Sequence, residues 1–119
     1  MRIYVAGPMT GIPYFNFPLF NRVADRLREQ GHEVFNPAER DNERHGVDIS
    51  ENNHTGDQKQ AQEQYGFSLR EALADDMDYI CREANCICML PGWEYSTGAK
   101  AEHALAVCLG HSIMYWSEE

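Results

Sequence analysis

The sequence predicts one α/β domain over residues 1–119, built as a three-layer sandwich around a parallel sheet of four to five strands. A chain of 119 residues has the length of a single domain with one core. Hydrophobic residues make up 43% and charged residues 24%, which is typical of globular proteins. Short apolar segments alternate with segments of helical periodicity, and this alternation favours parallel strands joined by right-handed crossovers.

The first third of the chain predicts a strand, a helix and a second strand. Residues 3–7 form a short apolar strand that ends in a glycine turn. Apolar residues then recur at helical spacing from Pro18 to Gln30, with Asn16 as the expected N-cap and Gly31 as the terminator. A second strand is expected at Glu33 to Phe35.

The second half of the chain repeats this alternation. Ser68 and Glu71 form a capping box, which predicts the start of a helix at this point. The buried stripe of that helix is expected to consist of Leu69, Leu73, Met77 and Ile80. The remaining elements are a strand over 86–90, a helix over 99–109 and a strand over 112–116.

Between the two halves, about residues 41–67 are nearly all polar and show no sustained periodicity. Val47, Ile49 and Tyr65 are the apolar side chains expected to anchor this segment. We therefore expect a long polar loop. Loops of this length usually act as a lid or a binding loop, or are disordered.

Charge and hydropathy exclude several classes of partner. The formal net charge of −9 repels a polyanion, so a nucleic-acid polymer is not expected to bind. A small anionic ligand remains compatible with it, because backbone N–H groups at a helix N-terminus bind phosphate locally. No apolar run approaches the roughly 20 residues of a membrane span, and the N-terminal residues lack the apolar stretch of a secretory signal. We expect a cytoplasmic protein with no membrane partner.

The cysteines also indicate a reducing compartment. They lie in apolar-periodic segments, with neither a C-x-x-C pair nor paired histidines beside them: Cys81, Cys86, Cys88 and Cys108. Buried free thiols are therefore favoured over a metal site. No metal and no cofactor is expected.

Two glycine-containing loops follow predicted strands and lead into helices, at residues 7–17 and 91–98. In an open parallel sheet the ligand sits at the carboxyl ends of the strands, where such loops meet. Glu102 lies near the start of the helix after the second loop, so its carboxylate is a candidate catalytic group. The alternative is a solvated glutamate favoured by the helix dipole. Trp93 is a candidate for stacking on a base, with a core or dimer contact as its alternative.

Three parts of the sequence resemble the nucleoside 2-deoxyribosyltransferase-like superfamily, in particular its small, often phage-encoded members. They are Ile3 to Gly11, the helix aspartate Asp76 before an apolar strand, and Ser96 to Glu102. The resemblance covers most of the chain outside about 41–67, and the Ser-x-Gly-x-x-x-Glu segment is its most specific part. It implies a flavodoxin-like parallel sheet and assembly into dimers or larger forms.

The resemblance also implies a catalytic pair. Glu102 matches the glutamate that attacks the anomeric carbon of a nucleoside. Asp76 best matches an aspartate that assists the departing base, with Asp75 and Asp78 as alternatives. These residue types suit the chemistry, because a carboxylate stabilises an oxocarbenium-like state and then traps it as a covalent glycosyl-enzyme.

Substrate-binding residues follow from the same resemblance. Tyr4 and the first loop would contact the sugar, while Ser96 and Gly98 would hold its 5′ end. The first-loop residues concerned are Gly7, Pro8, Met9 and Gly11. Nucleotide hydrolases of this superfamily tend to carry an arginine where this chain has Met9 or Thr10, so the need for a 5′-phosphate stays open.

The expected function is therefore cleavage or transfer at the N-glycosidic bond of a (deoxy)nucleoside or nucleotide. Hydrolysis and transfer differ only in which acceptor reaches the intermediate, and the sequence does not separate them. The alternative is a non-catalytic module that binds or senses a nucleotide in the same cleft. A small core and alanine-rich helix faces over 99–106 favour a homodimer or a larger homo-oligomer.

Overall fold

One parallel sheet runs through the middle of the protein, with its strands in the order β2-β1-β3-β4. The computed structural model describes residues 1–51, 53–66 and 68–117. Within these residues the strands are β1 (Arg2–Ala6), β2 (Glu33–Phe35), β3 (Cys86–Met89) and β4 (Ser112–Tyr115). The predicted parallel sheet of four to five strands is confirmed.

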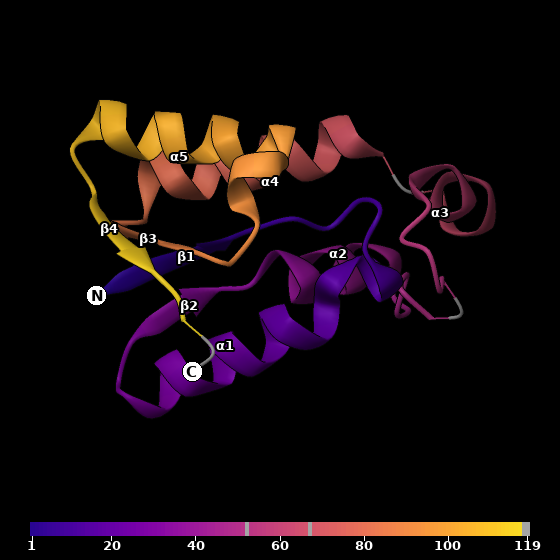
Figure 1. The fold of residues 1–119 in the computed structure, drawn as a ribbon, viewed down its shortest axis with the longest axis horizontal. Coiled ribbons are helices and arrows are strands. Elements are labelled where there is room, and N and C mark those ends of the chain that lie inside the picture. Colours follow the sequence, from indigo (N-terminus) through magenta and orange to yellow (C-terminus); the bar gives the residue numbers. More distant parts are fainter. Residues whose placement is uncertain (52, 67, 118–119) are drawn as a thin grey trace.

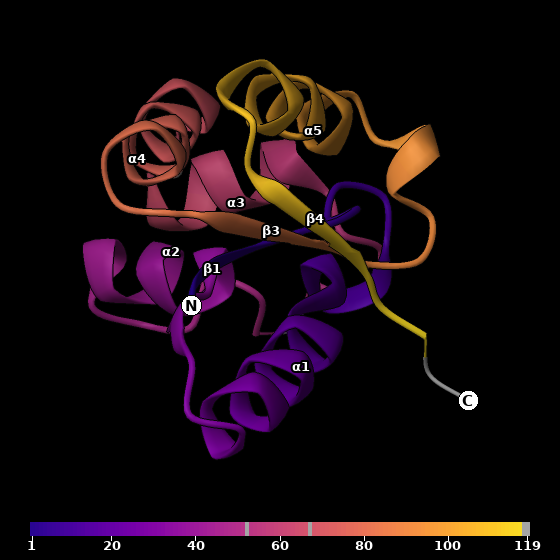
Figure 2. The ribbon, with the colours of Figure 1, turned by 90° about the vertical axis from the view of Figure 1, so that its left-hand side faces the viewer.

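Helices cover both faces of this sheet (Figures 1 and 2). The helices α4 (Leu69–Arg82) and α5 (Thr97–Leu109) lie on one face, and α1 (Phe17–Glu29) lies on the other. Two shorter helices, α2 (Pro37–His45) and α3 (Gln58–Tyr65), follow β2, and α3 lies beyond the carboxyl ends of the strands. Two short 3₁₀ turns complete the structure, η1 (Pro13–Asn16) and η2 (Trp93–Tyr95). None of the described helices is long and apolar enough to cross a membrane.

Alternate residues of β1 face the two helical layers. Ile3 and Val5 pack into the core beneath α1, whereas Tyr4 and Ala6 pack into the core beneath α4 and α5. This alternation follows from the two-residue period of a strand. It confirms the predicted three-layer sandwich, and it directs the side chain of Tyr4 toward α5.

The order of strands places a crevice at the carboxyl ends of β1 and β3. From β1 the chain crosses to β2 on one side, and β3 and β4 are added on the other side. The direction of winding therefore reverses between β1 and β3, whose last paired residues are Ala6 and Met89. In open α/β sheets such a switch point is where ligands bind.

The predicted polar loop over 41–67 is wrong, because two helices occupy much of that segment. Asn36 caps α2 by accepting a hydrogen bond from the backbone N–H of Ala38 at 3.0 Å. Asp57 caps α3 in the same way, through the N–H of Lys59 at 2.9 Å. These caps start short helices without a long apolar stripe. Residues 52 and 67 of the segment lie outside the described residues.

The buried face of α4 also differs from the predicted stripe. Ala72, Asp76 and Ile80 are its buried residues, whereas Leu69 is 44% exposed. The helix starts at the cap predicted from its sequence, since the Oγ of Ser68 accepts the N–H of Glu71 at 3.4 Å. A row of one alanine, one aspartate and one isoleucine carries little apolar signal. Apolar periodicity therefore missed Ala72 and Asp76, whereas Ile80 is buried as predicted and Met77 packs against the core.

Two further local predictions are corrected. Asn16 precedes α1 but makes no capping bond, because its backbone is left-handed and its Nδ2 donates to the carbonyl of Pro8 at 3.1 Å. Cys86 and Cys88 are buried free thiols as expected, but Cys81 and Cys108 are exposed. These two lie on helix positions that face away from the sheet.

Candidate active site

A cleft of about 510 Å³ opens at the carboxyl ends of β1 and β3, within the usual size range of small-molecule sites. Residues from both helical layers line it. The apolar wall comes from the side of α1 and includes Phe15, Phe17 and Phe20. The acidic side chains that line it come from α2, α4 and α5, namely Asp41, Asp76 and Glu102.

Glu102 points from α5 into this cleft. Ser96 fixes the start of the helix, since its Oγ accepts the N–H of Ala99 at 3.2 Å. Glu102 lies on the same buried row as Ala99 and Ala106, and only 5% of it is exposed. Tyr4 donates a hydrogen bond from its hydroxyl to Oε2 of Glu102 at 2.5 Å. The carboxylate is therefore buried and held from the sheet side.

Asp76 is the aspartate of α4 that faces the cleft. It is 7% exposed, and its buried Oδ1 has no hydrogen-bond partner among the residues that the structure describes. Asp75 instead forms an ion pair with Arg44 at 2.5 Å, and Asp78 pairs with Arg82 at 2.6 Å on the surface. Of the three aspartates, Asp76 is therefore the one that lines the cleft.

Glu102 and Asp76 hold their protons unusually well. Burial and then the charge of Asp76 raise the pKa of Glu102 to about 8, against the lowering effect of the Tyr4 hydrogen bond. Burial and then the charge of Asp41 raise the pKa of Asp76 to about 7. Burial also raises the pKa of the Tyr4 phenol. Because this site disfavours the ionised form of its carboxyls, a positive charge that develops inside it is stabilised strongly when they ionise.

The first loop and the start of α5 supply the neutral part of the lining. The predicted binding residues that line the cleft are Tyr4, Gly7, Pro8, Met9, Ser96 and Gly98. Gly7 allows close packing there, because a Cβ on it would lie 2.7 Å from the Cβ of Leu90. Most of the predicted binding residues therefore line the cleft.

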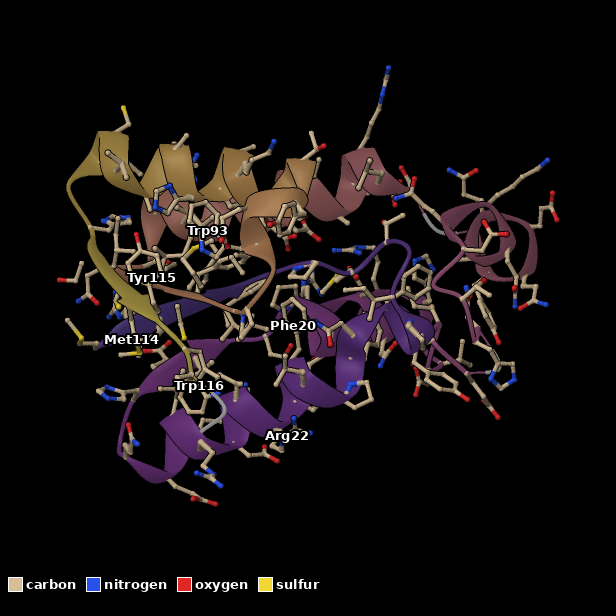
Figure 3. All side chains as sticks on the ribbon, in the orientation of Figure 1. Phe20, Arg22, Trp93, Met114, Tyr115 and Trp116 are labelled. Atoms are coloured by element: carbon tan, nitrogen blue, oxygen red, sulfur yellow. The ribbon has the colours of Figure 1, made fainter. Side chains whose placement is uncertain are left out.

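Gly11 and Trp93 are not among the described residues that line the cleft. The backbone N–H of Gly11 donates to the carbonyl of Gly56 at 2.9 Å, so this glycine holds two loops together. Trp93 stacks on His103 with ring centroids 4.4 Å apart, and it packs near Tyr115 beside β4 (Figure 3). The packing alternative for Trp93, rather than base stacking, describes its position in this structure.

A family model described as a domain of unknown function, DUF4406, matches residues 1–115. The chain belongs to this family. Neither a curated protein nor a solved structure matches the chain. The match extends from β1 to β4, so the DUF4406 domain includes every residue that lines the cleft.

Asp41 is a cleft residue of this DUF4406 domain that the sequence analysis missed. It lies on α2, is 4% exposed, and its Oδ1 accepts a hydrogen bond from Arg44 at 2.8 Å. Its pKa is raised by burial, against the lowering effect of Arg44. The sequence does contain a signal for the start of α2, which carries Asp41. Asn36 is followed by Pro37, and an N-cap residue followed by a first-turn proline is typical of a helix start.

A second missed feature of the DUF4406 domain is a left-handed turn before α1. Tyr14, Phe15 and Asn16 all have positive φ values between 53° and 61°, a conformation that costs non-glycine residues roughly 1–2 kcal/mol each. Contacts with the segment before α3 hold this turn. The N–H of Tyr14 donates to the carbonyl of Asn53 at 2.8 Å, and its hydroxyl lies 2.6 Å from Nδ1 of His54. The turn brings Phe15 to the cleft wall.

No three His, Cys, Asp or Glu side chains within residues 1–51, 53–66 and 68–117 are grouped so that they could hold a metal ion.

Proposed function

We propose that this protein cleaves or transfers the N-glycosidic bond of a (deoxy)nucleoside or nucleotide, with Glu102 as the nucleophile. The observation that carries the proposal is the placement of the Glu102 carboxyl. It is buried in the cleft, bonded to Tyr4 at 2.5 Å, and electrostatically coupled to Asp76. The resemblance of Ser96 to Glu102 to the nucleoside 2-deoxyribosyltransferase-like superfamily supports the same role.

The charge of the site suits an oxocarbenium-like transition state. As the bond between the anomeric carbon and the base nitrogen breaks, positive charge develops on the sugar and the bonding pair leaves with the base. That charge offsets the burial that raises the pKa of Glu102, so the ionised carboxylate becomes favourable at this moment. The site therefore stabilises the transition state more than the uncharged ground state.

The proposed reaction then proceeds in two steps. The hydroxyl of Tyr4 engages Oε2 of Glu102, which leaves Oε1 to form the bond to the anomeric carbon. The reactive form of the site is the one in which the proton shared by the two carboxyls lies on Asp76 and Glu102 is ionised, and Asp76 gives this proton to the departing base. Water or a second base then attacks the glycosyl-enzyme and releases Glu102. Water completes hydrolysis, and a base completes transfer.

A second candidate function is a non-catalytic module that binds or senses a nucleotide. The observation in its favour is the same pKa of about 8, because a protonated Glu102 in the empty cleft is no nucleophile. Such a module would use the carboxyls as hydrogen-bonding groups only.

Incubation with a panel of deoxynucleosides and their 5′-monophosphates, followed by chromatography for free base, separates the two candidates. An enzyme releases base, and the release is lost in Glu102→Gln. Glu94→Gln is the matched control, because Glu94 is an exposed glutamate on η2 and does not line the cleft. Base release that persists in Glu102→Gln contradicts the proposed nucleophile. Tight binding without turnover in the wild type supports the sensing module instead.

A further inference from the structure

The cleft holds a third carboxylate, Asp41, for which the proposed reaction has no use. Its position is fixed by a network between α2 and α4. Arg44 donates to Oδ1 of Asp41 at 2.8 Å and to Oδ2 of Asp75 at 2.5 Å and 3.1 Å. Only 14% of the Arg44 side chain is exposed. This arginine fixes Asp41 in place, and it does not itself line the cleft.

The three carboxyls line one cleft from neighbouring helices, in the order Glu102, Asp76, Asp41. They lie on α5, α4 and α2, and α4 packs against both of the other helices (Figure 2). The electrostatic influences agree with this order. The charge with the largest effect on Glu102 is that of Asp76, whereas the charge with the largest effect on Asp76 is that of Asp41. Asp76 therefore lies on the helix between those that carry Glu102 and Asp41.

One oxygen of this row lacks a hydrogen-bond partner among the described residues. It is Oδ1 of Asp76, which is buried. Asp41 also lines the cleft, and its Oδ1 accepts from Arg44. No described arginine, lysine or histidine lines the cleft. A buried acceptor requires a donor, and a bound ligand supplies one.

If Glu102 meets the anomeric carbon and Asp76 meets the departing base, Asp41 faces the far edge of that base. The group that projects furthest from the glycosidic nitrogen is the exocyclic substituent, an amino group in adenine and cytosine and a keto group in hypoxanthine and uracil. A carboxylate accepts from the amino group and repels the keto oxygen. We infer that Asp41 selects nucleosides whose base carries an exocyclic amino group, an inference that rests on the proposed function.

Deaminated pairs of nucleosides test this inference, because each pair exchanges the exocyclic amino group for a keto oxygen and otherwise changes only the protonation of the neighbouring ring nitrogen. Deoxyadenosine is compared with deoxyinosine, and deoxycytidine with deoxyuridine. A hydrogen bond to a charged group predicts a preference in kcat/KM for the amino member of about 10- to 100-fold. In the wild-type protein, equal kcat/KM values for the two members of a pair, or a preference for the keto member, would by themselves overturn the inference.

Asp41→Asn sharpens the test. Arg44 will still donate to the remaining oxygen at this position, which turns the new amide N–H₂ toward the base as a donor. The preference is therefore expected to invert in favour of the keto member. Asp75→Asn is the matched control, because Asp75 bonds the same arginine but does not line the cleft, and it should keep the wild-type preference. Retention of the amino preference in Asp41→Asn contradicts the role of Asp41.

Calorimetric binding of the same pairs to Glu102→Gln separates failure of this inference from failure of the proposed function. Tighter binding of the amino members without turnover by the wild type supports the role of Asp41 and rejects the enzyme. Turnover of both members at equal rates supports the enzyme and rejects the role of Asp41.

Discussion

The hydroxyl of Tyr4 and Oε2 of Glu102 lie 2.5 Å apart, although the two residues are 98 positions apart in the sequence. This bond joins the first strand to the last helix at the floor of the cleft. It is buried, and because it favours the ionised form of Glu102 it lowers the pKa of that carboxyl. Tyr4 also packs on Phe35, with ring centroids 5.5 Å apart, so the phenol is fixed independently of Glu102.

Tyr4→Phe should therefore alter the titration of Glu102 with little change in packing. The hydrogen bond lowers the pKa of Glu102, so its loss raises that pKa further. Because the ionised carboxylate is the proposed nucleophile, the acid limb of the pH–rate profile is expected to move up by about one pH unit. Tyr79→Phe is the control, because the Tyr79 hydroxyl is buried without a partner among the described residues. An unchanged acid limb in Tyr4→Phe would contradict the coupling.

The stability of the protein should fall as pH rises between about 4 and 8. The pKa of Glu102 is raised from 4.5 to about 8 and that of Asp76 from 3.8 to about 7, so the folded state binds more protons than the unfolded state in this window. The contribution of these two carboxyls to stability is therefore fully present below their pKa values in the unfolded state. It is lost as the pH rises through their pKa values in the folded state. Thermal unfolding should show a decrease in Tm on the order of 10 °C from pH 5 to pH 8.

Glu102→Gln tests the origin of that decrease, because it replaces the titrating group with a neutral isostere. The slope of Tm against pH is expected to flatten, and the variant should melt above the wild type at pH 8. If Tm falls equally steeply with pH in Glu102→Gln, groups other than Glu102 cause the decrease in stability.

The sequence predicted the position of Glu102 for a physical reason. Ser96 at the cap and the spacing from it to Glu102 fix where the carboxyl lies on α5, and both are local features. The alternation of apolar segments likewise predicted all four strands of the described sheet. Local signals of this kind need no knowledge of which other segments lie nearby.

Features set by tertiary contacts were not predictable in this way. Asp76 lies on the buried row of α4, which apolar periodicity assigns to solvent, because its environment is the cleft rather than the core. The left-handed turn at Tyr14 to Asn16 contains no glycine, so its conformation depends on bonds from Asn53 and His54 far along the chain. No sequence pattern within residues 7–17 indicates these contacts with Asn53 and His54.

That loop contact leads to a prediction about Gly56. Its φ is +70°, and a Cβ at this position would overlap the backbone of Ile12, while its carbonyl accepts the N–H of Gly11 at 2.9 Å. Gly66 has a nearly identical φ of +72° but open space around it. Gly66→Ala should cost roughly 1–2 kcal/mol of unfolding free energy from backbone strain alone. Gly56→Ala should cost at least 1–3 kcal/mol more, from the overlap.

Chemical denaturation of both variants measures this difference. Because residues 7–10 of the loop that ends at Gly11 line the cleft, Gly56→Ala should also weaken nucleoside binding, whereas Gly66→Ala should not. Equal losses of stability in the two variants would show that the contact between the loops is not maintained in solution.

The charge of the cleft predicts a preference for nucleosides over their 5′-monophosphates. Three carboxyls line it, no described basic side chain does, and the whole chain carries a net charge of −9. The N–H groups at the start of α5 are the remaining attraction for a phosphate, and the cap at Ser96 already uses that of Ala99. A dianionic phosphate near these carboxylates is repelled, and like charges a few ångströms apart in a protein cost about 1–4 kcal/mol.

We therefore expect kcat/KM for deoxyadenosine to exceed that for its 5′-monophosphate at least about 10-fold at low salt, with the ratio shrinking as ionic strength rises. A monophosphate that is the better substrate at every salt concentration would show that the backbone N–H groups of α5 outweigh the acidic lining.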